Sequence, residues 1–595
     1  MQQRRRGLHP RLGLLASVVL IVGACGTAAS PSPSASSPSA PGSEPPASSP
    51  GGDFTGLVHP ESGEAPCGEA EAPDAEHGKY TGNIKRISAT SASEVVFELC
   101  NPDVAFLAKI AFSSFAINDS AYLEANAANG TIVEAPNGTG PYKLGEWNRG
   151  TEIVFEANPD YWGETTGAPT LVFRWSTEGL ARVNELSAGT VDGIDNVPPE
   201  SFEAIRGNAD LQLKEREGLN TLYLGFNNNP QAEGFDNSTN PFANEAVRQA
   251  VAMGIDRQQI VDQFYPPGSE VADYFTPCSI PNACEGDAWY EFDAAAARQA
   301  LADAGYPNGF ETTLSYRPAV RGYLPDPPAV ATAIQAQLQA NLGITATLDQ
   351  QDDTTFIDNA NQGLLTGLHL LGWGADYPDV TNFLDFHFGA GASPQFGDKF
   401  DDITSALAEG AAGSSDEDRQ PSYVAANNAI RTHVPMVPIV HGGSGVAFKA
   451  DVEGAHSSPL GNENMSVMNP GGRDTFVWMQ NGEPGGLYCA DETDGESLRA
   501  CEQIMESLYA YEIGGTAAEP ALAEECAPNE TLDVWTCTLR SGVKFHDGAD
   551  LDANDVVLSY AAQWDAEHEL HVGRESTFTY FSALFGGFLN PPPAE

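Results

Sequence analysis

Positive charge is scarce in this 595-residue sequence, in which 29 Lys and Arg stand against 82 Asp and Glu for a formal net charge of −53. Nucleic acids and anionic membrane surfaces attract basic proteins, so this balance argues against both as main partners. A cationic ligand or a generally solvated, salt-tolerant acidic surface can explain it, and we favour the surface. Long apolar runs are missing too, because no segment after residue 22 is long and apolar enough to cross a membrane.

Signatures of metal, phosphate and catalytic sites are also missing. The cysteines form no CxxC pair and no Cys/His cluster, and His568 and His571 lack the spacing of HExxH. The glycine-rich stretch at 137–140 is not followed by Gly-Lys-Ser/Thr, and residues 442–446 lack the last glycine of a nucleophile elbow. The segment with Asp547, Asp550, Asp552 and Asn554 resembles a calcium loop only loosely, because it lacks the central glycine. We therefore expect no metal, no cofactor and no enzymatic activity.

The N-terminus has the pattern of an export signal. Arginines at positions 4–6 and 11 precede the apolar run 12–22, which is too short for a permanent membrane span and typical of a signal peptide. The run ends in Val22-Gly-Ala-Cys25, which resembles a bacterial lipobox with Cys25 as the lipidated residue. The alternative is an ordinary signal peptide with a stray cysteine. We expect an extracytoplasmic lipoprotein anchored to the cell membrane, at the cell surface or in the periplasm.

The mature sequence begins with a tether and contains an even number of cysteines. Residues 26–52 are almost wholly Ser, Pro, Ala, Gly and Thr, and their reach lies between roughly 30 Å as a coil and roughly 80 Å as polyproline II. In an exported protein, the eight cysteines that remain without Cys25 predict disulfides. Local spacing pairs Cys278 with Cys284 and Cys526 with Cys537, the second across two strands; elimination leaves Cys489 with Cys501 and Cys67 with Cys100.

Beyond the tether, helical and strand patterns alternate. Residues 84–87, 95–99, 345–348 and 435–440 are predicted as strands, and residues 294–304 and 330–342 as helices. This alternation predicts α/β layers, and the length predicts at least two lobes.

Several motifs together resemble a known family. Asn137-Gly-Thr-Gly-Pro-Tyr142 precedes Asn158-Pro-Asp-Tyr-Trp-Gly163, and a helix begins with Asn244-Glu-Ala-Val-Arg248, its apolar positions on one face. With the segment from Trp373 to Pro378, these motifs resemble the oligopeptide- and dipeptide-binding family of extracytoplasmic solute-binding proteins of ABC transporters (family 5). The resemblance implies an α/β two-lobed periplasmic-binding-protein fold with an extra small domain.

The order of the motifs departs from the family. Phe476-Val-Trp-Met479, the helical segment 498–508 and Gly542-Val-Lys-Phe-His-Asp-Gly548 resemble the opening of family members, yet they come last here. A truncated two-copy array is the alternative, but the motif at 158–163 is not repeated. We therefore expect a circular permutant whose ends meet at a surface loop. The predicted parts are the signal peptide (1–25), the tether (26–52), the small domain (53–140 and 506–595), the large lobe (141–228 and 441–505) and the second lobe (229–440).

The resemblance also implies a ligand site. Asp376 is implied to hold a peptide's α-ammonium group, Trp373 to pack beside the peptide, and Gly372 and Gly374 to let the main chain approach it. On the facing lobe, Thr493, Asp494 and Gly495 are implied to pair with the peptide as an added strand. Weaker candidates are Asp195, Asn196 and Tyr223. Leu370 stands where some members carry an arginine for the peptide carboxylate, so capture of that carboxylate is not expected there.

These observations predict a binding protein that captures di- or oligopeptides between two lobes and delivers them to the permease of an ABC importer. Closure follows because a ligand that contacts both lobes selects the closed state. We expect a monomer that makes contact with the membrane only through its lipid. The alternatives are the same scaffold binding an oligosaccharide or another small solute, a non-transport sensor, and an enzyme, for which no catalytic set is found.

Overall fold

A computed structural model describes residues 54–68, 77–164 and 166–592. The predicted signal peptide, Cys25 and the predicted tether lie outside the described residues. Within the described residues, no helix is both long enough and apolar enough to span a membrane.

Strands of the described chain gather into three main sheets. The small-domain sheet has the order β1 (Val58–His59), β2 (Ile84–Ser91), β3 (Glu94–Leu99), β20 (Val534–Leu539), β19 (Ala523–Pro528). The large-lobe sheet has the order β4 (Tyr142–Asn148), β5 (Glu152–Ala157), β6 (Thr170–Trp175), β16 (Thr475–Gln480), β7 (Gly193–Ile194), β15 (Ser444–Lys449), β8 (Leu211–Arg216). The second-lobe sheet has the order β10 (Glu270–Val271), β14 (Met436–His441), β9 (Asn220–Phe226), β13 (Leu368–Gly374), β11 (Glu311–Tyr316), β12 (Thr345–Gln350).

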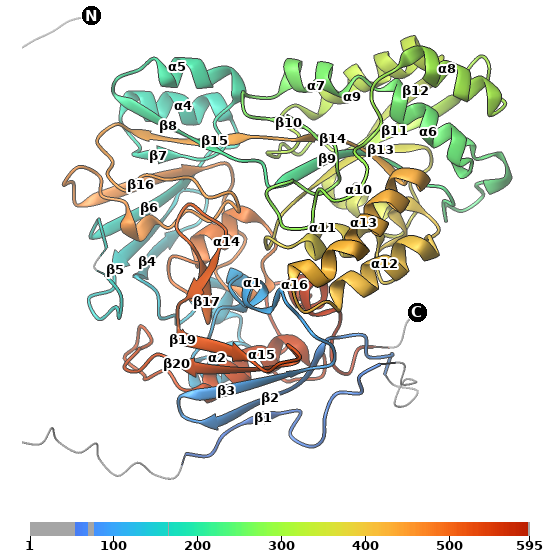
Figure 1. The fold of residues 1–595 in the computed structure, drawn as a ribbon. Helices are drawn as coiled ribbons and strands as arrows, with labels where there is room; N and C mark the ends of the chain where they lie inside the picture. The colour runs from blue at the N-terminus through green and yellow to red at the C-terminus, as the bar shows by residue number, and fades with distance from the viewer. Residues whose placement is uncertain (1–53, 69–76, 165, 593–595) are drawn as a thin grey trace, which may run out of the picture. The chain divides into compact units, whose positions relative to one another are not determined.

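Segments from the two ends of the sequence share one sheet in the small domain. Strand β3 pairs antiparallel with β20, so that Phe97 faces Trp535 in the register. Figure 1 shows these blue and red strands side by side. Helix α15 (Ala553–Trp564) covers this sheet, and Tyr560 from that helix packs against Phe97 at a ring distance of 5.0 Å. Neither end could bury its apolar residues without the other.

The large lobe is completed in the same way by a strand from late in the sequence. Strand β16 lies between β6 and β7 and is parallel to both. Its Trp478 is fully buried, and α14 (Gly495–Cys501) follows it. The helix predicted over residues 498–508 is shorter in the structure. It ends at Cys501, and β17 (Tyr509–Tyr511) follows.

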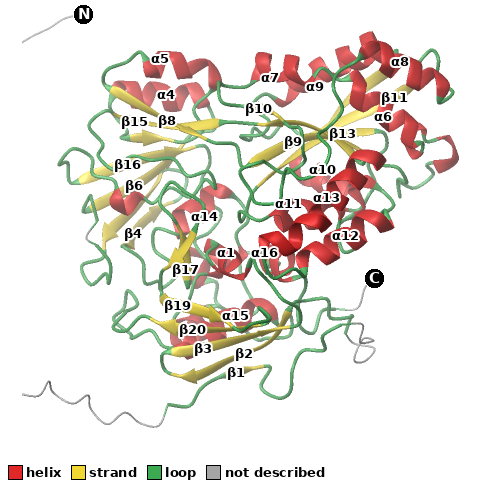
Figure 2. Ribbon diagram, in the orientation of Figure 1, coloured by secondary structure: helices red, strands yellow, loops and turns green. Residues whose placement is uncertain are grey.

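Helices gather around the second-lobe sheet (Figure 2), as the alternating pattern predicts. Helix α6 (Glu245–Gly254) is representative: the Asn244 side chain accepts a hydrogen bond from Ala246 N at the helix start, and Val247 and Val251 are fully buried. The other helices of this lobe are α7 (Arg257–Phe264), α8 (Ala294–Asp303), α9 (Pro327–Gln337), α10 (Asp353–Asn361), α11 (Val380–Phe388), α12 (Asp401–Ala411) and α13 (Asp416–His433).

The chain crosses between the large lobe and the second lobe at two adjacent places. One crossing joins β8 to β9 and the other joins β14 to β15. Asn220 links them, since its Nδ2 donates to Gly442 O (2.7 Å) and its Oδ1 accepts from Gly442 N (2.8 Å). A Cβ on Gly218 would lie 2.5 Å from Gly442 O, so this approach requires glycine. Because β9 belongs to the second-lobe sheet, the second lobe begins near residue 220, earlier than the predicted boundary at 229.

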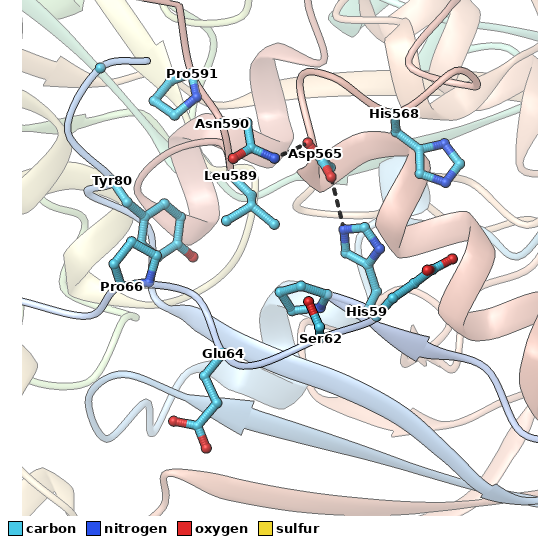
Figure 3. Close-up of a pocket in the computed structure, with 13 residues that line it drawn as sticks. His59, Ser62, Glu64, Pro66, Tyr80, Asp565, His568, Leu589, Asn590 and Pro591 are labelled. Atoms are coloured by element: carbon cyan, nitrogen blue, oxygen red, sulfur yellow. Dashed lines mark hydrogen bonds and ion pairs between the residues drawn. The ribbon is translucent and has the colours of Figure 1, made fainter. Parts of the chain in front are cut away.

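Residues 78–83, near the start of the described chain, lie against its last segment. Gly78 N donates to Pro591 O (2.7 Å), and Asn83 N donates to Phe585 O. Figure 3 shows the cavity beside these contacts, where Asp565 accepts a hydrogen bond from Asn590 (2.9 Å) and pairs with His59 (3.2 Å).

The predicted disulfides are confirmed. Cys67 is joined to Cys100, Cys278 to Cys284, Cys489 to Cys501 and Cys526 to Cys537. The last pair faces across β19 and β20 in register, as the strand pattern on either side of the turn predicts.

A group of buried charges fixes α14 against the large-lobe sheet. Arg499 donates through Nη1 to Asp195 (3.0 Å) and through Nε to Glu463 (3.0 Å), and Arg216 also pairs with Glu463. All four side chains are largely buried, with 10% exposure or less. Burial opposes ionisation of Glu463, but the two guanidinium groups hold its pKa below the usual range.

We predict that Arg499→Ala destabilises the protein by about 3–5 kcal/mol, because it leaves the carboxylates of Asp195 and Glu463 buried without their partner. Urea unfolding followed by circular dichroism measures this. The control is Arg206→Ala, which removes surface ion pairs with Glu203 and Glu215 and is expected to lower the free energy of unfolding far less. Equal losses in the two variants would contradict the prediction.

Candidate functional site

Strand β13 ends at Gly374 and is followed directly by Asp376. Tyr377 anchors this turn: its ring is 4% exposed, belongs to the apolar core of the small domain and lies under Lys109 Nζ at 5.6 Å. Asp379 then begins α11 by accepting from Thr381 N, and Arg419 holds the same carboxylate through two hydrogen bonds of 2.7 and 2.8 Å. The turn that carries Asp376 is therefore held on both sides.

Asp376 is a half-buried carboxyl group with donors on several sides. Asn382 Nδ2 donates to its Oδ2 (2.9 Å), while Asn382 Oδ1 accepts from Asp376 N (3.0 Å) and from Trp373 Nε1 (3.2 Å). The Tyr580 hydroxyl also donates to the carboxyl group, and the Tyr511 hydroxyl lies 3.2 Å from Asp376 O. Burial raises the pKa of Asp376 to about 6, although the hydrogen bonds from Asn382 and Tyr580 act to lower it.

The facing segment comes from the start of α14. Asp494 caps this helix by accepting from Ser497 N (2.8 Å), and Thr493 and Gly495 are exposed beside it. The Tyr580 hydroxyl, which reaches Asp376, also lies 3.4 Å from Thr493 O. The structure therefore brings Asp376 and residues 493–495 to the same place, with Tyr580 between them.

A cavity of about 180 Å³ opens at this place. Its walls come from the second lobe at Asp376, from α14 and the residues after it, and from the small domain at residues 111–113 and 507–513. A Cβ built on Gly374 or on Gly495 would have no neighbour within 4 Å, so both glycines border open space. The arrangement can hold a cationic group against Asp376 while main-chain groups on either side remain accessible.

A second cavity, of about 450 Å³, lies where segments around His59 and Tyr80 meet segments around Asp565 and Asn590. Its lining includes His59, Tyr80, Asp565 and Asn590 (Figure 3), and none of the residues predicted to bind ligand. Among the described residues, no group of three or more His, Cys, Asp or Glu is placed to hold a metal ion, here or elsewhere. We place the candidate site at the cavity beside Asp376.

Comparison with known proteins agrees with this architecture. Residues 40–395 and 517–576 match the family model described as bacterial extracellular solute-binding proteins, family 5 middle. The chain belongs to this family. It is thus an extracytoplasmic binding protein of the kind that serves ABC transporters, and not an enzyme.

Relatives of this solute-binding protein include named peptide binders. A dipeptide-binding protein from Pseudomonas aeruginosa is 29% identical over 386 residues, which cover 64% of this chain and 70% of the relative. Heme-binding protein A from Haemophilus influenzae is 27% identical, covering 64% of this chain and 69% of the relative. A dipeptide-binding protein from Pseudoalteromonas sp. SM9913, solved with Met-Leu, is 25% identical with a TM-score of 0.54, over 64% of this chain and 72% of that one. The expected two-lobed fold is confirmed.

Two predicted site residues of the solute-binding protein lie away from the cavity beside Asp376. The Asp195 carboxylate is 2% exposed and occupied by Arg499. Asn196 Nδ2 donates to Asp195 Oδ2 (3.0 Å) and to Asn481 Oδ1 (3.2 Å). Both residues therefore stabilise the large lobe, and neither lines the cavity.

Tyr223 and Gly372 also serve the interior of the second lobe. The Tyr223 side chain is 1% exposed among aromatic rings, and its hydroxyl donates to Gln395 Oε1 (2.9 Å). A Cβ on Gly372 would lie 2.3 Å from the Tyr323 ring and 2.5 Å from Thr221 O, so glycine is needed there for packing. Trp373 is half-buried and stacks on Phe386 at 4.1 Å, so Phe386 covers one of its faces.

Several residues of the site were missed by the sequence analysis. Asn382 follows Asp376 by six residues on the first turn of α11, and its sequence position alone gave no sign that it binds back to the turn. Tyr511 and Tyr580 reach the site from segments more than 130 residues away in sequence. Only the contact between the small domain and the second lobe brings these two tyrosines to Asp376.

We predict opposite outcomes for two neighbouring glycines of β13. Gly372→Ala places a methyl group against Tyr323 and Thr221 and is expected to cost about 1–3 kcal/mol in the free energy of unfolding. Gly374→Ala, its matched control, meets no neighbour and is expected to change that free energy by about 0.5 kcal/mol or less. Urea titration of both variants checks this, and equal stabilities would show that β13 relaxes around the added methyl group.

Proposed function

We propose that this protein captures short peptides at the cavity beside Asp376 and delivers them to an ABC importer. Asp376 carries the proposal, because it is a half-buried carboxyl group that faces an open cavity at the meeting point of the lobes. A peptide's α-ammonium group would form a charge-assisted hydrogen bond there and offset the cost of burying the carboxylate. The names of the relatives, which include di- and tripeptide-binding proteins, support this ligand class.

The accessible glycines give the peptide backbone room. Gly495 lines the cavity, and Gly374 borders open space two residues before Asp376, so main-chain N–H and C=O groups at both places have room to pair with an extended peptide. Such pairing is independent of side chains, so it suits a binder of many sequences. Trp373, Thr493 and Asp494 are assigned supporting contacts in the same proposal.

The proposed transport role includes an anchor. Cys25 is the lipidated residue in this proposal, and the segment 26–52 is the tether that lets the binding domain reach a permease in the same membrane. A peptide that touches Asp376 on one side and residues 493–495 on the other favours the closed arrangement of the lobes, which the permease would recognise. The protein is expected to act as a monomer.

We predict that Asp376→Asn weakens peptide binding by roughly tenfold or more, since an amide oxygen can accept a hydrogen bond from an ammonium group but carries no charge to pair with it. Isothermal titration of residues 26–595 with a panel of di- and tripeptides that includes Met-Leu measures this.

The pKa of Asp376 in the wild type, about 6, adds a test by pH. The carboxylate must be ionised to bind, so affinity should rise with pH through the pKa and be roughly tenfold weaker at about pH 5 than at about pH 7.

Two controls accompany this measurement. N-acetylated peptides lack the ammonium group and should bind weakly and equally to wild type and to Asp376→Asn. Glu409→Gln removes an exposed charge on α12 and should leave affinity unchanged. Absence of binding by the whole panel, or unchanged affinity in Asp376→Asn, would overturn the proposal.

We also infer that the chain is a circular permutant of its family. The order of the motifs supports this, as do the mixed origins of the sheets, in which β20 pairs with β3 and β16 lies between β6 and β7. The contact between Gly78 and Pro591 supports a former covalent connection near these residues. Circular permutation preserves a fold where the joined ends lie close together.

We predict that a reordered chain folds and binds peptide like the original. It would contain residues 472–592, a Gly/Ser linker of about 15 residues, and residues 54–471, so that the new ends lie at exposed Gly471 and Gly472. Circular dichroism and the melting temperature should match within about 5 °C. A control with the same linker but opened between Pro438 and Ile439, inside buried β14, should not fold. Failure of the first chain would contradict the inference.

A further inference from the structure

Glu502 carries a carboxyl group that lines the cavity beside Asp376, and one of its oxygens accepts no hydrogen bond within the described residues. It directly follows α14 and lines the cavity together with Asp376. Its Oε1 is buried and, among the described residues, makes no hydrogen bond. A buried polar atom without a partner is costly, so it calls for an explanation. The nearby Glu506 differs, because it accepts hydrogen bonds from Thr139, Tyr161 and Trp162.

The charges around the cavity are unbalanced. Its lining includes the carboxyl groups of Asp376, Glu502 and Glu506, and Arg499 is the single basic residue among the described residues that line it. Arg499 is already paired with Asp195 and Glu463, neither of which lines the cavity. The cavity therefore has acidic groups for a cation in addition to the α-ammonium group assigned to Asp376.

The protonation of Glu502 reflects the same imbalance. Burial raises its pKa well above the usual range, and the charge of Arg499 only partly opposes this. A cation that entered the cavity would favour the ionised carboxylate and supply the missing hydrogen-bond donors.

The size and walls of the cavity indicate the kind of cation. A volume of about 180 Å³ is below the roughly 300–1,000 Å³ of sites for whole drug-sized ligands, and it suits one side chain. Phe112, Leu460, Leu498 and Met505 supply apolar walls. Lysine and arginine side chains combine an apolar stem with a cationic end, which matches apolar walls beside an unpaired carboxyl group.

We propose that the cavity receives the side chain of the peptide's first residue and that Glu502 selects lysine or arginine at that position. This rests on the proposed function, because it takes the α-ammonium group to lie at Asp376 in the same cavity. Glu502 is a specificity-determining residue in this proposal, while backbone pairing supplies the affinity that all peptides share.

Titration calorimetry with matched peptides tests the proposal. Lys-Ala and Lys-Ala-Ala are compared with norleucyl-Ala and norleucyl-Ala-Ala, which keep the lysine stem but lack its ammonium group. Wild type should bind the lysine peptides roughly tenfold more tightly or better. Glu502→Gln should remove most of this difference by weakening the lysine peptides alone, and Glu409→Gln should preserve it. Binding of the norleucine peptides by Glu502→Gln also reports that the variant is folded.

The outcomes separate the two proposals. Equal affinity of wild type for the lysine and norleucine peptides, or an undiminished preference in Glu502→Gln, would overturn the role of Glu502 while leaving peptide binding intact. Ala-Lys binding as tightly as Lys-Ala would overturn the assignment to the first residue. Failure of every peptide to bind would overturn this inference together with the proposed function.

Discussion

The buried pairing of Arg499 with Asp195 and Glu463 is the constraint on which the solute site depends. Three segments distant in sequence meet there, and none of the charges could remain buried without the others. Arg499 also lies 5.8 Å from the Trp478 ring of β16 and donates to Gly461 O, so it fixes both the sheet and the loop beside it. Because the cavity wall is built on α14, the positions of Gly495 and Glu502 follow from this one arginine.

The opposite wall, at Asp376, depends on side-chain hydrogen bonds to the turn that carries this residue. Asn382 holds the turn at Asp376 through both its amide atoms, and Arg419 holds Asp379 three residues later. These contacts leave the Asp376 carboxyl group facing the cavity while its backbone is fixed. Both walls use a buried guanidinium group that pairs with carboxylates: Arg499 pairs with Asp195 and Glu463, and Arg419 pairs with Asp379 beside the turn that carries Asp376.

Local patterns in the sequence were sufficient for many of the elements and for two of the four disulfides. The apolar face of residues 245–254 predicts α6, and the turn between Cys526 and Cys537 predicts their cross-strand pairing. Long-range contacts could not be predicted in this way. Asp195 is an acidic residue before a proline turn, as a ligand-binding residue could be. Only its hydrogen bond from Arg499 shows that its carboxylate already has a partner within the protein. Tyr223 lies on a strand that the sequence placed in the other lobe, so its burial could not be foreseen.

The two crossings between the lobes have a mechanical consequence. Asn220 ties one crossing to Gly442 of the other through two hydrogen bonds, so bending one connection alone would have to strain or break them. Everything between them, from β9 to β14, is one uninterrupted stretch of sequence. A rearrangement of the gene that cuts outside this stretch therefore leaves the second lobe whole. Reordering of the large lobe and the small domain in the sequence is therefore compatible with an undivided second lobe.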